Sequence, residues 1–200
     1  MSDYVLATAN VGKIAEMQSI LSSLNINVKT REDLDITIEV AETGTTFFEN
    51  ASLKAKAICM ASGLPAIADD SGLVVTSLGG EPGLYSSSFG GEELTNEERC
   101  IFLLKKMENM EHRVAKFVCT IVCCFPSGDI ITATGECPGS ITKYPKGRGG
   151  FGYDPVFLPE GMNVTMAELT PDEKNKISHR GIALRNFKNK LSEYCEEMSI

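Results

Sequence analysis

The chain has 200 residues, of which 42% are hydrophobic and 23% charged, with a formal net charge of −8. This length predicts one domain, simple or two-lobed, and the composition excludes a disordered or a collagen-like chain. The acidic balance argues against general binding of nucleic acid, which requires a basic face.

Strands and helices are predicted to alternate in the first half of the chain. A short buried strand at residues 4–7 leads into a helix from about Lys13 to Leu24, whose apolar residues recur at helical spacing. A second strand follows near residues 27–30. Thr46 and Glu49 have the spacing of a capping box that opens a second helix.

The second helix is predicted to turn Phe48 inward, and a short apolar strand at residues 66–68 then ends at two aspartates. In the second half, residues 114–125 and 130–136 flank a turn and predict a long hairpin. A short strand is expected at residues 155–157, before a closing helix that has Met198 on its apolar side. The alternation and the hairpin together indicate an α/β fold with a mixed sheet.

No segment predicts export or membrane insertion. The N-terminus lacks a basic region, and no apolar run reaches the ~20 residues that cross a bilayer. The seven cysteines include no CxxC pair, and three of them lie in the apolar run Phe117–Phe125. A zinc site is the alternative, but the spacing favours reduced core thiols in a cytoplasmic protein.

The segment Thr8–Lys13 joins the first strand to the first helix and is the first candidate site. Amides at a helix N-terminus attract phosphate, and Lys13 adds a full positive charge. The spacing is not that of a P-loop. An ordinary strand-to-helix turn capped by Asn10 is the alternative.

Asp69 and Asp70 form the second candidate site. Adjacent carboxylates repel each other, so a fold keeps them where a cation or a transferred proton offsets the cost. Mg²⁺ takes oxygen ligands, usually one or two carboxylates plus substrate phosphate oxygens, and Glu42 is a plausible distant partner. Because side chains alternate along a strand, only one aspartate is expected to point into any one site. A solvated acidic turn is the alternative.

The glycine-rich segment Gly149–Asp154 and the dipeptide His179-Arg180 are weaker candidates. Glycines let the backbone approach a ligand, and the aromatic residues of this segment can stack on a planar base. His179 and Arg180 offer several donors for a carbonyl or phosphate oxygen. The alternatives are a mobile loop and a structural histidine. Combined with the first two candidates, these segments indicate a nucleotide site.

Six sequence blocks lie in order along nearly the whole chain: Thr8-x-Asn10-x-x-Lys13, Glu42-Thr43-Gly44-Thr45-Thr46-Phe47-x-Glu49-Asn50-Ala51-x-x-Lys54-Ala55, Ala68-Asp69-Asp70-Ser71-Gly72-Leu73, Leu78-Gly79-Gly80-x-Pro82-Gly83-x-Tyr85-Ser86, Gly150-Phe151-Gly152-Tyr153-Asp154-Pro155 and Ser178-His179-Arg180-Gly181-x-Ala183-Leu184. Together they resemble the dITP/XTP (inosine triphosphate) pyrophosphatase family of non-canonical purine nucleoside triphosphate pyrophosphatases. The resemblance implies one two-lobed domain over residues 1–200, assembled as a homodimer. Its fold would be α/β, with an elongated central mixed sheet flanked by helices and an active-site cleft between the lobes.

The resemblance also implies an activity, which is Mg²⁺-dependent hydrolysis of ITP, dITP and XTP to the monophosphate and pyrophosphate. Asp70 and Asp69 would be catalytic, with Asp70 as the proton acceptor, and Glu42 and Asp70 would bind the metal. The residues around the phosphates would be Thr8, Asn10, Gly12, Lys13, Lys54 and Ser71. Those around the base and sugar would be Phe151, Gly152, Tyr153, Asp154, Lys174, His179 and Arg180.

One segment departs from the family pattern. Relatives often have Tyr-Ser-Ala-Arg where this chain has Tyr85-Ser86-Ser87-Ser88, so a cation that could touch the triphosphate is missing. Two other readings stay open, namely a nucleotide-binding or sensing module without hydrolysis and a pyrophosphatase for other modified-base triphosphates. The intact carboxylates speak against the first, because a pure binder needs no proton acceptor.

Overall fold

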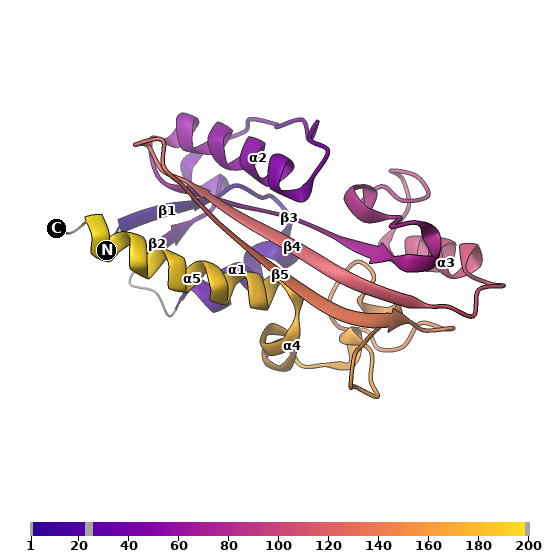
Figure 1. Cartoon of the computed structure of the whole chain (residues 1–200). Helices are drawn as coiled ribbons and strands as arrows, with labels where there is room; N and C mark the ends of the chain where they lie inside the picture. The colour runs from indigo at the N-terminus through magenta and orange to yellow at the C-terminus, as the bar shows by residue number, and fades with distance from the viewer. Residues whose placement is uncertain (1, 23–25, 199–200) are drawn as a thin grey trace. The chain divides into compact units, whose positions relative to one another are not determined.

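The computed structural model describes residues 2–22 and 26–198. Its longer elements are β1 (Ser2–Leu6), α1 (Val11–Leu21), β2 (Ile26–Lys29), α2 (Phe47–Ser62), β3 (Ala66–Val75), α3 (Asn96–Lys106), β4 (Val114–Cys124), β5 (Ile130–Ile141), β6 (Phe157–Pro159), α4 (Pro171–Ile177) and α5 (His179–Met198) (Figure 1). The described strands form one sheet in the order β2-β1-β3-β4-β5-β6. β1 is parallel to β2 and β3, whereas β6 is antiparallel to β5. The predicted α/β fold with a mixed sheet is therefore confirmed.

The chain divides into two compact units. Unit 1 consists of Met1–Asp70, Cys119–Gly135 and Arg180–Ile200, and unit 2 of Ser71–Val118 and Glu136–His179. β3, β4 and β5 each begin in one unit and continue in the other.

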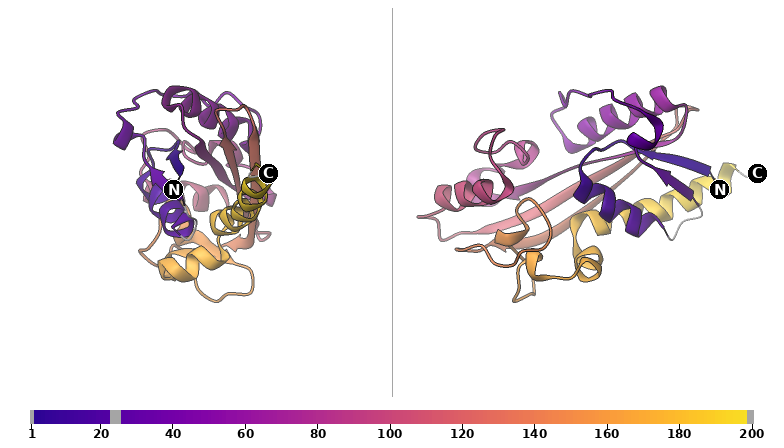
Figure 2. Two further views of the ribbon diagram at one scale, coloured as in Figure 1. Left: turned by 90° about the vertical axis from the view of Figure 1, so that its left-hand side faces the viewer. Right: turned by 180° about the vertical axis from the view of Figure 1, so that it is seen from behind.

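Helices cover both faces of the strands in unit 1, because side chains alternate along a strand. Leu6 and Ile67 pack with residues of α1 and α5 in one core. Val5 and Ala68 turn the other way and pack with residues of α2 in a second core. The two views in Figure 2 accordingly place α2 and α5 on opposite sides of these strands. Both faces of these strands are therefore buried, so polar residues on either face are shielded from solvent.

A side-chain cap determines where α1 begins. The Asn10 side chain accepts a hydrogen bond from the Lys13 amide at 3.1 Å, which satisfies one of the free amides of the first turn. The helix consequently starts at Val11, slightly earlier than predicted. Its predicted end at Leu24 lies outside the described residues.

The start of α2 agrees only in part with the predicted capping box. Thr46 accepts a hydrogen bond from the Glu49 amide at 3.1 Å, as a cap should. The Glu49 carboxylate, however, accepts from the Thr45 amide at 2.6 Å, one residue before the cap. Phe48 is 45% exposed, so the prediction of an inward side chain is wrong for this residue.

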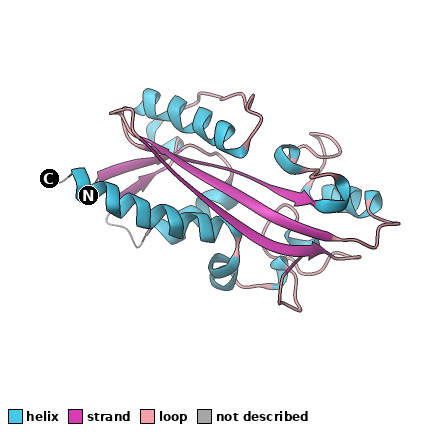
Figure 3. Cartoon of the chain, in the orientation of Figure 1, coloured by secondary structure: helices cyan, strands magenta, loops and turns pink. Residues whose placement is uncertain are grey.

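β3 is one uninterrupted strand of ten residues (Figure 3), which corrects the prediction of a short strand that ends at Asp69 and Asp70. The sequence Asp-Asp-Ser-Gly has the composition of a turn, but here the glycine allows close packing. A Cβ atom on Gly72 would lie 2.2 Å from the Gly83 carbonyl oxygen. Both aspartates therefore lie in mid-strand and are directed to opposite faces.

Unit 2 has its own core, which includes Leu73 of β3, Leu103 of α3 and Phe117 of β4. The predicted strand at residues 155–157 is mostly wrong, because Asp154–Val156 form a 3-10 turn and β6 begins only at residue 157. Proline, which lacks an amide hydrogen and has a fixed φ, suits such a turn better than a strand.

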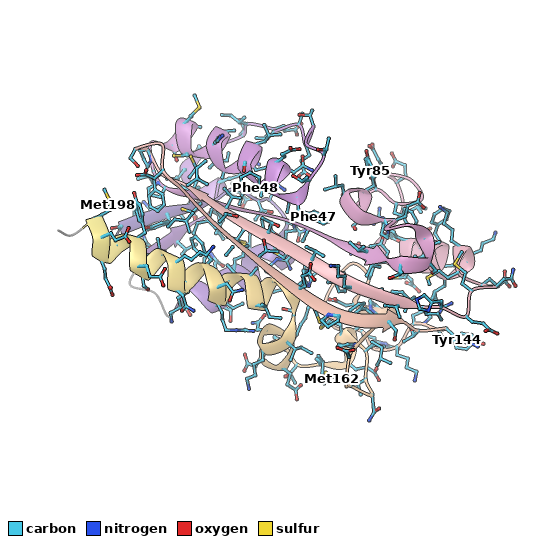
Figure 4. All side chains as sticks on the ribbon, in the orientation of Figure 1. Phe47, Phe48, Tyr85, Tyr144, Met162 and Met198 are labelled. Carbon is cyan, nitrogen blue, oxygen red and sulfur yellow. The ribbon has the colours of Figure 1, made fainter. Side chains whose placement is uncertain are left out.

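α5 ends in an exposed turn rather than an apolar one. Met198 is 65% exposed at the end of this helix (Figure 4), so its predicted place on the apolar side is wrong. Within the described ranges, no helix is both long and apolar enough to cross a membrane. Cys119, Cys123 and Cys124 of β4 are buried free thiols, as predicted.

Candidate active site

Asp69 and Asp70 are neighbours in β3, but their side chains have different partners. Asp69 contacts residues of α1 and α5, whereas Asp70 contacts a lysine of α2. This division follows from the alternation of side chains along a strand. The prediction that the two carboxylates diverge is therefore confirmed.

The Asp69 carboxylate is surrounded by cations. Its Oδ2 atom lies 3.0 Å from Lys13 Nζ and accepts hydrogen bonds from Arg180 Nε at 3.1 Å and Nη2 at 3.0 Å. Burial alone would raise the pKa of this carboxyl group, but Lys13 and Arg180 lower it well below its ordinary value. Asp69 is therefore an ionised anchor for two cations near neutral pH.

Arg180 completes the charge balance of this cluster. Its guanidinium is buried, and its Nη1 atom also donates to the carboxylate of Glu16. Burial alone would lower the pKa of Arg180, but the carboxylates of Asp69 and Glu16 raise it. Sequence reasoning missed Glu16, although it lies three residues after Lys13 and hence on the same side of α1. Two cations and two carboxylates thus neutralise each other on this face of β3.

The Asp70 carboxylate has fewer partners. Its Oδ1 atom lies 3.3 Å from Lys54 Nζ, which also donates to Glu42 Oε1 at 2.8 Å. Its Oδ2 atom is buried and has no hydrogen-bond partner in the described part of the chain. Burial raises the pKa of Asp70 and Glu42 raises it further, against the opposing effect of Lys54. Asp70 is thus more basic than an ordinary carboxylate and has one oxygen available.

Lys54 remains a cation in this position. Its side chain is largely buried, and burial alone would lower its pKa, but the nearby carboxylates of Asp70, Asp69 and Glu42 raise it. The lysine therefore brings a full positive charge to Asp70 and Glu42.

The donor set around Asp70 suits a hard divalent cation. Among residues 2–22 and 26–198, no group of three or more His, Cys, Asp or Glu side chains gathers as a metal site. Glu42 and Asp70 nevertheless lie against one lysine ammonium, and Asp70 Oδ2 is a buried oxygen that lacks a partner. Mg²⁺ usually binds through one or two carboxylates and completes its shell with water and substrate phosphate oxygens. These residues therefore fit Mg²⁺.

The turn before α1 is held together by its own side chains. Thr8 Oγ1 accepts a hydrogen bond from the Asn10 amide at 3.2 Å, and Asn10 in turn caps the helix at Lys13. The cap that was the alternative explanation of Asn10 is thus present. Asn10 is exposed, whereas Thr8 and Gly12 are half-buried.

A second group of predicted residues lies in unit 2. Asp154 Oδ2 lies 2.5 Å from Lys174 Nζ and accepts a hydrogen bond from the Phe151 amide at 2.8 Å. The same ammonium lies 4.6 Å from the centroid of the Phe151 ring. A Cβ atom on Gly150 would come within 2.0 Å of Asp154 Oδ2, so only glycine allows this close approach. The aromatic ring, the lysine and the carboxylate thus form one connected cluster.

The remaining predicted residues of unit 2 have separate partners. His179 stacks on Phe117, with ring centroids 4.6 Å apart and an interplanar angle of 13°. Tyr153 is buried and donates its hydroxyl to a backbone carbonyl, and the Gly152 carbonyl accepts from Cys100 Sγ at 3.3 Å. Ser71 is half-buried.

Arg180 and His179, which the resemblance places together around the base, have different contacts. Arg180 binds Asp69 and Glu16, whereas His179 stacks on Phe117. Sequence reasoning also missed Phe117, because nothing marks it among the other apolar residues of its strand.

Comparison with known proteins gives a consistent result. The sequence model of the Ham1 family matches residues 4–190. A dITP/XTP pyrophosphatase of Aquifex aeolicus is 50% identical over an alignment of 202 residues, which covers 96% of this chain and 98% of that protein. A second dITP/XTP pyrophosphatase, from Bacillus subtilis, is 43% identical and covers 98% of each chain.

Solved structures agree with the sequence comparison. A HAM1 protein from Coxiella burnetii has a TM-score of 0.88 at 40% identity, and the match covers 96% of this chain and 100% of that one. A dITP/XTP pyrophosphatase from Mycobacterium abscessus has a TM-score of 0.75 at 38% identity, and the match covers 92% and 97%. Sequence and fold therefore both show that this chain belongs to the Ham1 family.

Proposed function

We propose that this chain hydrolyses dITP, XTP and ITP to the nucleoside monophosphate and pyrophosphate with the help of Mg²⁺. The observation that carries the proposal is Asp70, a buried carboxylate with a raised pKa and an unpartnered oxygen, beside Lys54 and Glu42. Relatives named dITP/XTP pyrophosphatase, among them one that is 50% identical, support the choice of substrate. We further propose that residues 1–200 act as one domain in the cytoplasm, where the nucleotide pool lies.

Charge is the first requirement for binding such a substrate. A nucleoside triphosphate carries about four negative charges near neutral pH, and this chain has a net charge of −8. Because carboxylates already balance Lys13 and Lys54, these two ammonium groups would serve the phosphates as hydrogen-bond donors, together with the amides of the turn from Thr8 to Gly12 at the start of α1. Glu42 and Asp70 would hold Mg²⁺, which when bound offsets phosphate charge and polarises the phosphorus under attack.

Asp70 has the properties of the proton acceptor. Water attacks the α-phosphorus, the bond to the oxygen that bridges to the β-phosphorus breaks, and pyrophosphate leaves. The attacking water must lose a proton, and a carboxylate with a raised pKa accepts it more readily than an ordinary one. Asp69 is a poor proton acceptor, because its pKa is lowered and its Oδ2 atom is bound by Lys13 and Arg180. We therefore assign Asp69 to positioning.

The base is proposed to bind at the cluster of Phe151, Asp154 and Lys174, with His179 as a donor to its O6 carbonyl. A buried donor that is aimed at this carbonyl would face the amino group of adenine unpaired, which costs about 1–3 kcal/mol. Arg180, the other donor considered for this atom, is held by two carboxylates. The donor role therefore falls to His179.

A panel of triphosphates tests the proposed activity. We expect dITP, XTP and ITP to release pyrophosphate in the presence of Mg²⁺, with kcat/KM about 5- to 150-fold above that of dATP. Chelation of the cation by EDTA should abolish turnover. Release of inorganic phosphate instead of pyrophosphate would contradict the proposal, and preferential turnover of pyrimidine triphosphates would favour the reading as an enzyme for other modified bases.

We also propose that the chain forms a homodimer, as its resemblance to the family implies. Light scattering at micromolar concentration should then give twice the mass of 21.7 kDa that one chain has. A mass of one chain at that concentration would rule the dimer out.

A further inference from the structure

Ser86 joins three segments of unit 2. Its Oγ atom accepts a hydrogen bond from the Leu73 amide of β3 at 2.9 Å and donates to the Gly83 carbonyl at 2.6 Å. Its own carbonyl oxygen accepts from the hydroxyl of Tyr153 at 2.9 Å. One residue thus ties the glycine-rich loop to the strand that continues from Asp70.

The contact between this segment and β3 leaves no free space. A Cβ atom on Gly72 would lie 2.2 Å from the Gly83 carbonyl oxygen and 2.7 Å from Ser86 Oγ. Leu73, which donates to Ser86, is completely buried. The position of Ser86 against β3 is therefore fixed by both packing and hydrogen bonding.

The other end of the connection is also buried. Tyr153 is 4% exposed, and its ring packs in the core of unit 2. Burial raises the pKa of its hydroxyl, so the group stays protonated and remains a donor at any pH used for assay. In the chain, Tyr153 lies between Phe151 and Asp154, which are joined by their own hydrogen bond.

We propose that Ser86 and Tyr153 are positioning residues for base selection, which fix Phe151 and Asp154 relative to β3. The inference rests on the proposed function, in which Phe151 and Asp154 bind the base. It gives Tyr153 a different role from the contact with base or sugar that family resemblance implies, because its hydroxyl is engaged by Ser86. A loop released from this anchor can shift by a fraction of an ångström, and misplacement on that scale weakens a hydrogen-bonded site.

Two conservative variants with matched controls test this role. Tyr153→Phe and Ser86→Ala each remove one hydroxyl, while Tyr85→Phe and Ser87→Ala remove hydroxyls from exposed neighbours (Figure 4 labels Tyr85). Calorimetric titration with inosine monophosphate and with AMP measures base selection without turnover. We expect the wild type to prefer inosine monophosphate, and each test variant to reduce the ratio of the two dissociation constants about fivefold. The control variants should keep the wild-type ratio.

The double variant and the melting temperature complete the test. Because both hydroxyls act through one connection, the double variant should lose little more selectivity than either single variant. A lower melting temperature with an unchanged ratio would show that the pair only supports the fold, and a wild type without preference for inosine monophosphate would likewise overturn the inference. Failure of the proposed function is a separate result, since it appears as absent pyrophosphate release from dITP even if binding is selective.

Discussion

Replacing Asp70 with asparagine is expected to lower the turnover of dITP about a thousandfold and to leave the chain folded. The loss follows because an amide cannot accept the proton of the attacking water, a contribution of about 10²–10⁴ in rate. The measurement is pyrophosphate release at saturating dITP and Mg²⁺. Turnover near that of the wild type would refute the role assigned to Asp70.

The same variant should be at least as stable as the wild type near neutral pH. Burial raises the pKa of Asp70 in the folded state, so the ionised carboxylate opposes folding above that pKa. Asparagine has nearly the same shape without the charge. The raised pKa also predicts that wild-type kcat/KM falls as the pH decreases through it, because a protonated carboxyl group accepts no proton. Loss of folding in Asp70→Asn would contradict the stability argument.

Replacing Asp69 with asparagine is expected to destabilise the fold, in contrast to Asp70→Asn. We expect a loss of about 3–5 kcal/mol in the free energy of unfolding. This change removes the carboxylate that holds Lys13 and the fully buried Arg180, and it leaves their positive charges without sufficient compensation. For a chain of this size, we expect a melting temperature about 10 °C lower. Thermal unfolding of the Asp69→Asn and Asp70→Asn variants side by side is the measurement, because the two changes are chemically identical and adjacent in one strand.

The pH dependence of the free energy of unfolding provides a control for the stabilising role assigned to Asp69. Its pKa in the folded state lies below that of the unfolded chain, which is about 4. Its contribution to stability is therefore present above pH ~4 and is lost as the pH falls toward the lowered value. The difference between wild type and Asp69→Asn should be largest near neutral pH and should narrow below pH 4. Equal melting temperatures for the two asparagine variants would contradict the different roles of the aspartates.

Local patterns predicted the fold class and most of the candidate residues. Alternating apolar segments indicated the α/β fold, and Lys13, Asp69 and Asp70 were recognisable from their place between or beside secondary-structure elements. The full length of β3 was not recognisable from the sequence. A pair of aspartates in a buried strand is stable only when cations from distant parts of the chain lie beside it. One of those cations, Arg180, lies 111 positions along the chain from Asp69.

The other differences also arise from contacts that no local pattern shows. Phe117 is distinguished from the other apolar residues of its strand only by the stacking of His179 on its ring. Ser86 stood in a recognised motif, but its hydrogen bonds to Leu73 and Tyr153 depend on how three separate segments pack. Glu16 is the exception, because its distance from Lys13 along one helix was readable from the sequence.

The unbroken course of β3 through Asp69 and Asp70 has a consequence for how this protein can change in evolution. A one-residue slip of a strand moves every side chain to the opposite face. After an insertion of one residue, Asp69 would take the place of Asp70 beside Lys54, and Asp70 would take the place of Ser71. A single inserted residue before this pair would therefore take Asp69 away from Lys13 and Arg180 and take Asp70 away from Lys54 at once, so the lineage can vary the side chains around the strand far more freely than its length.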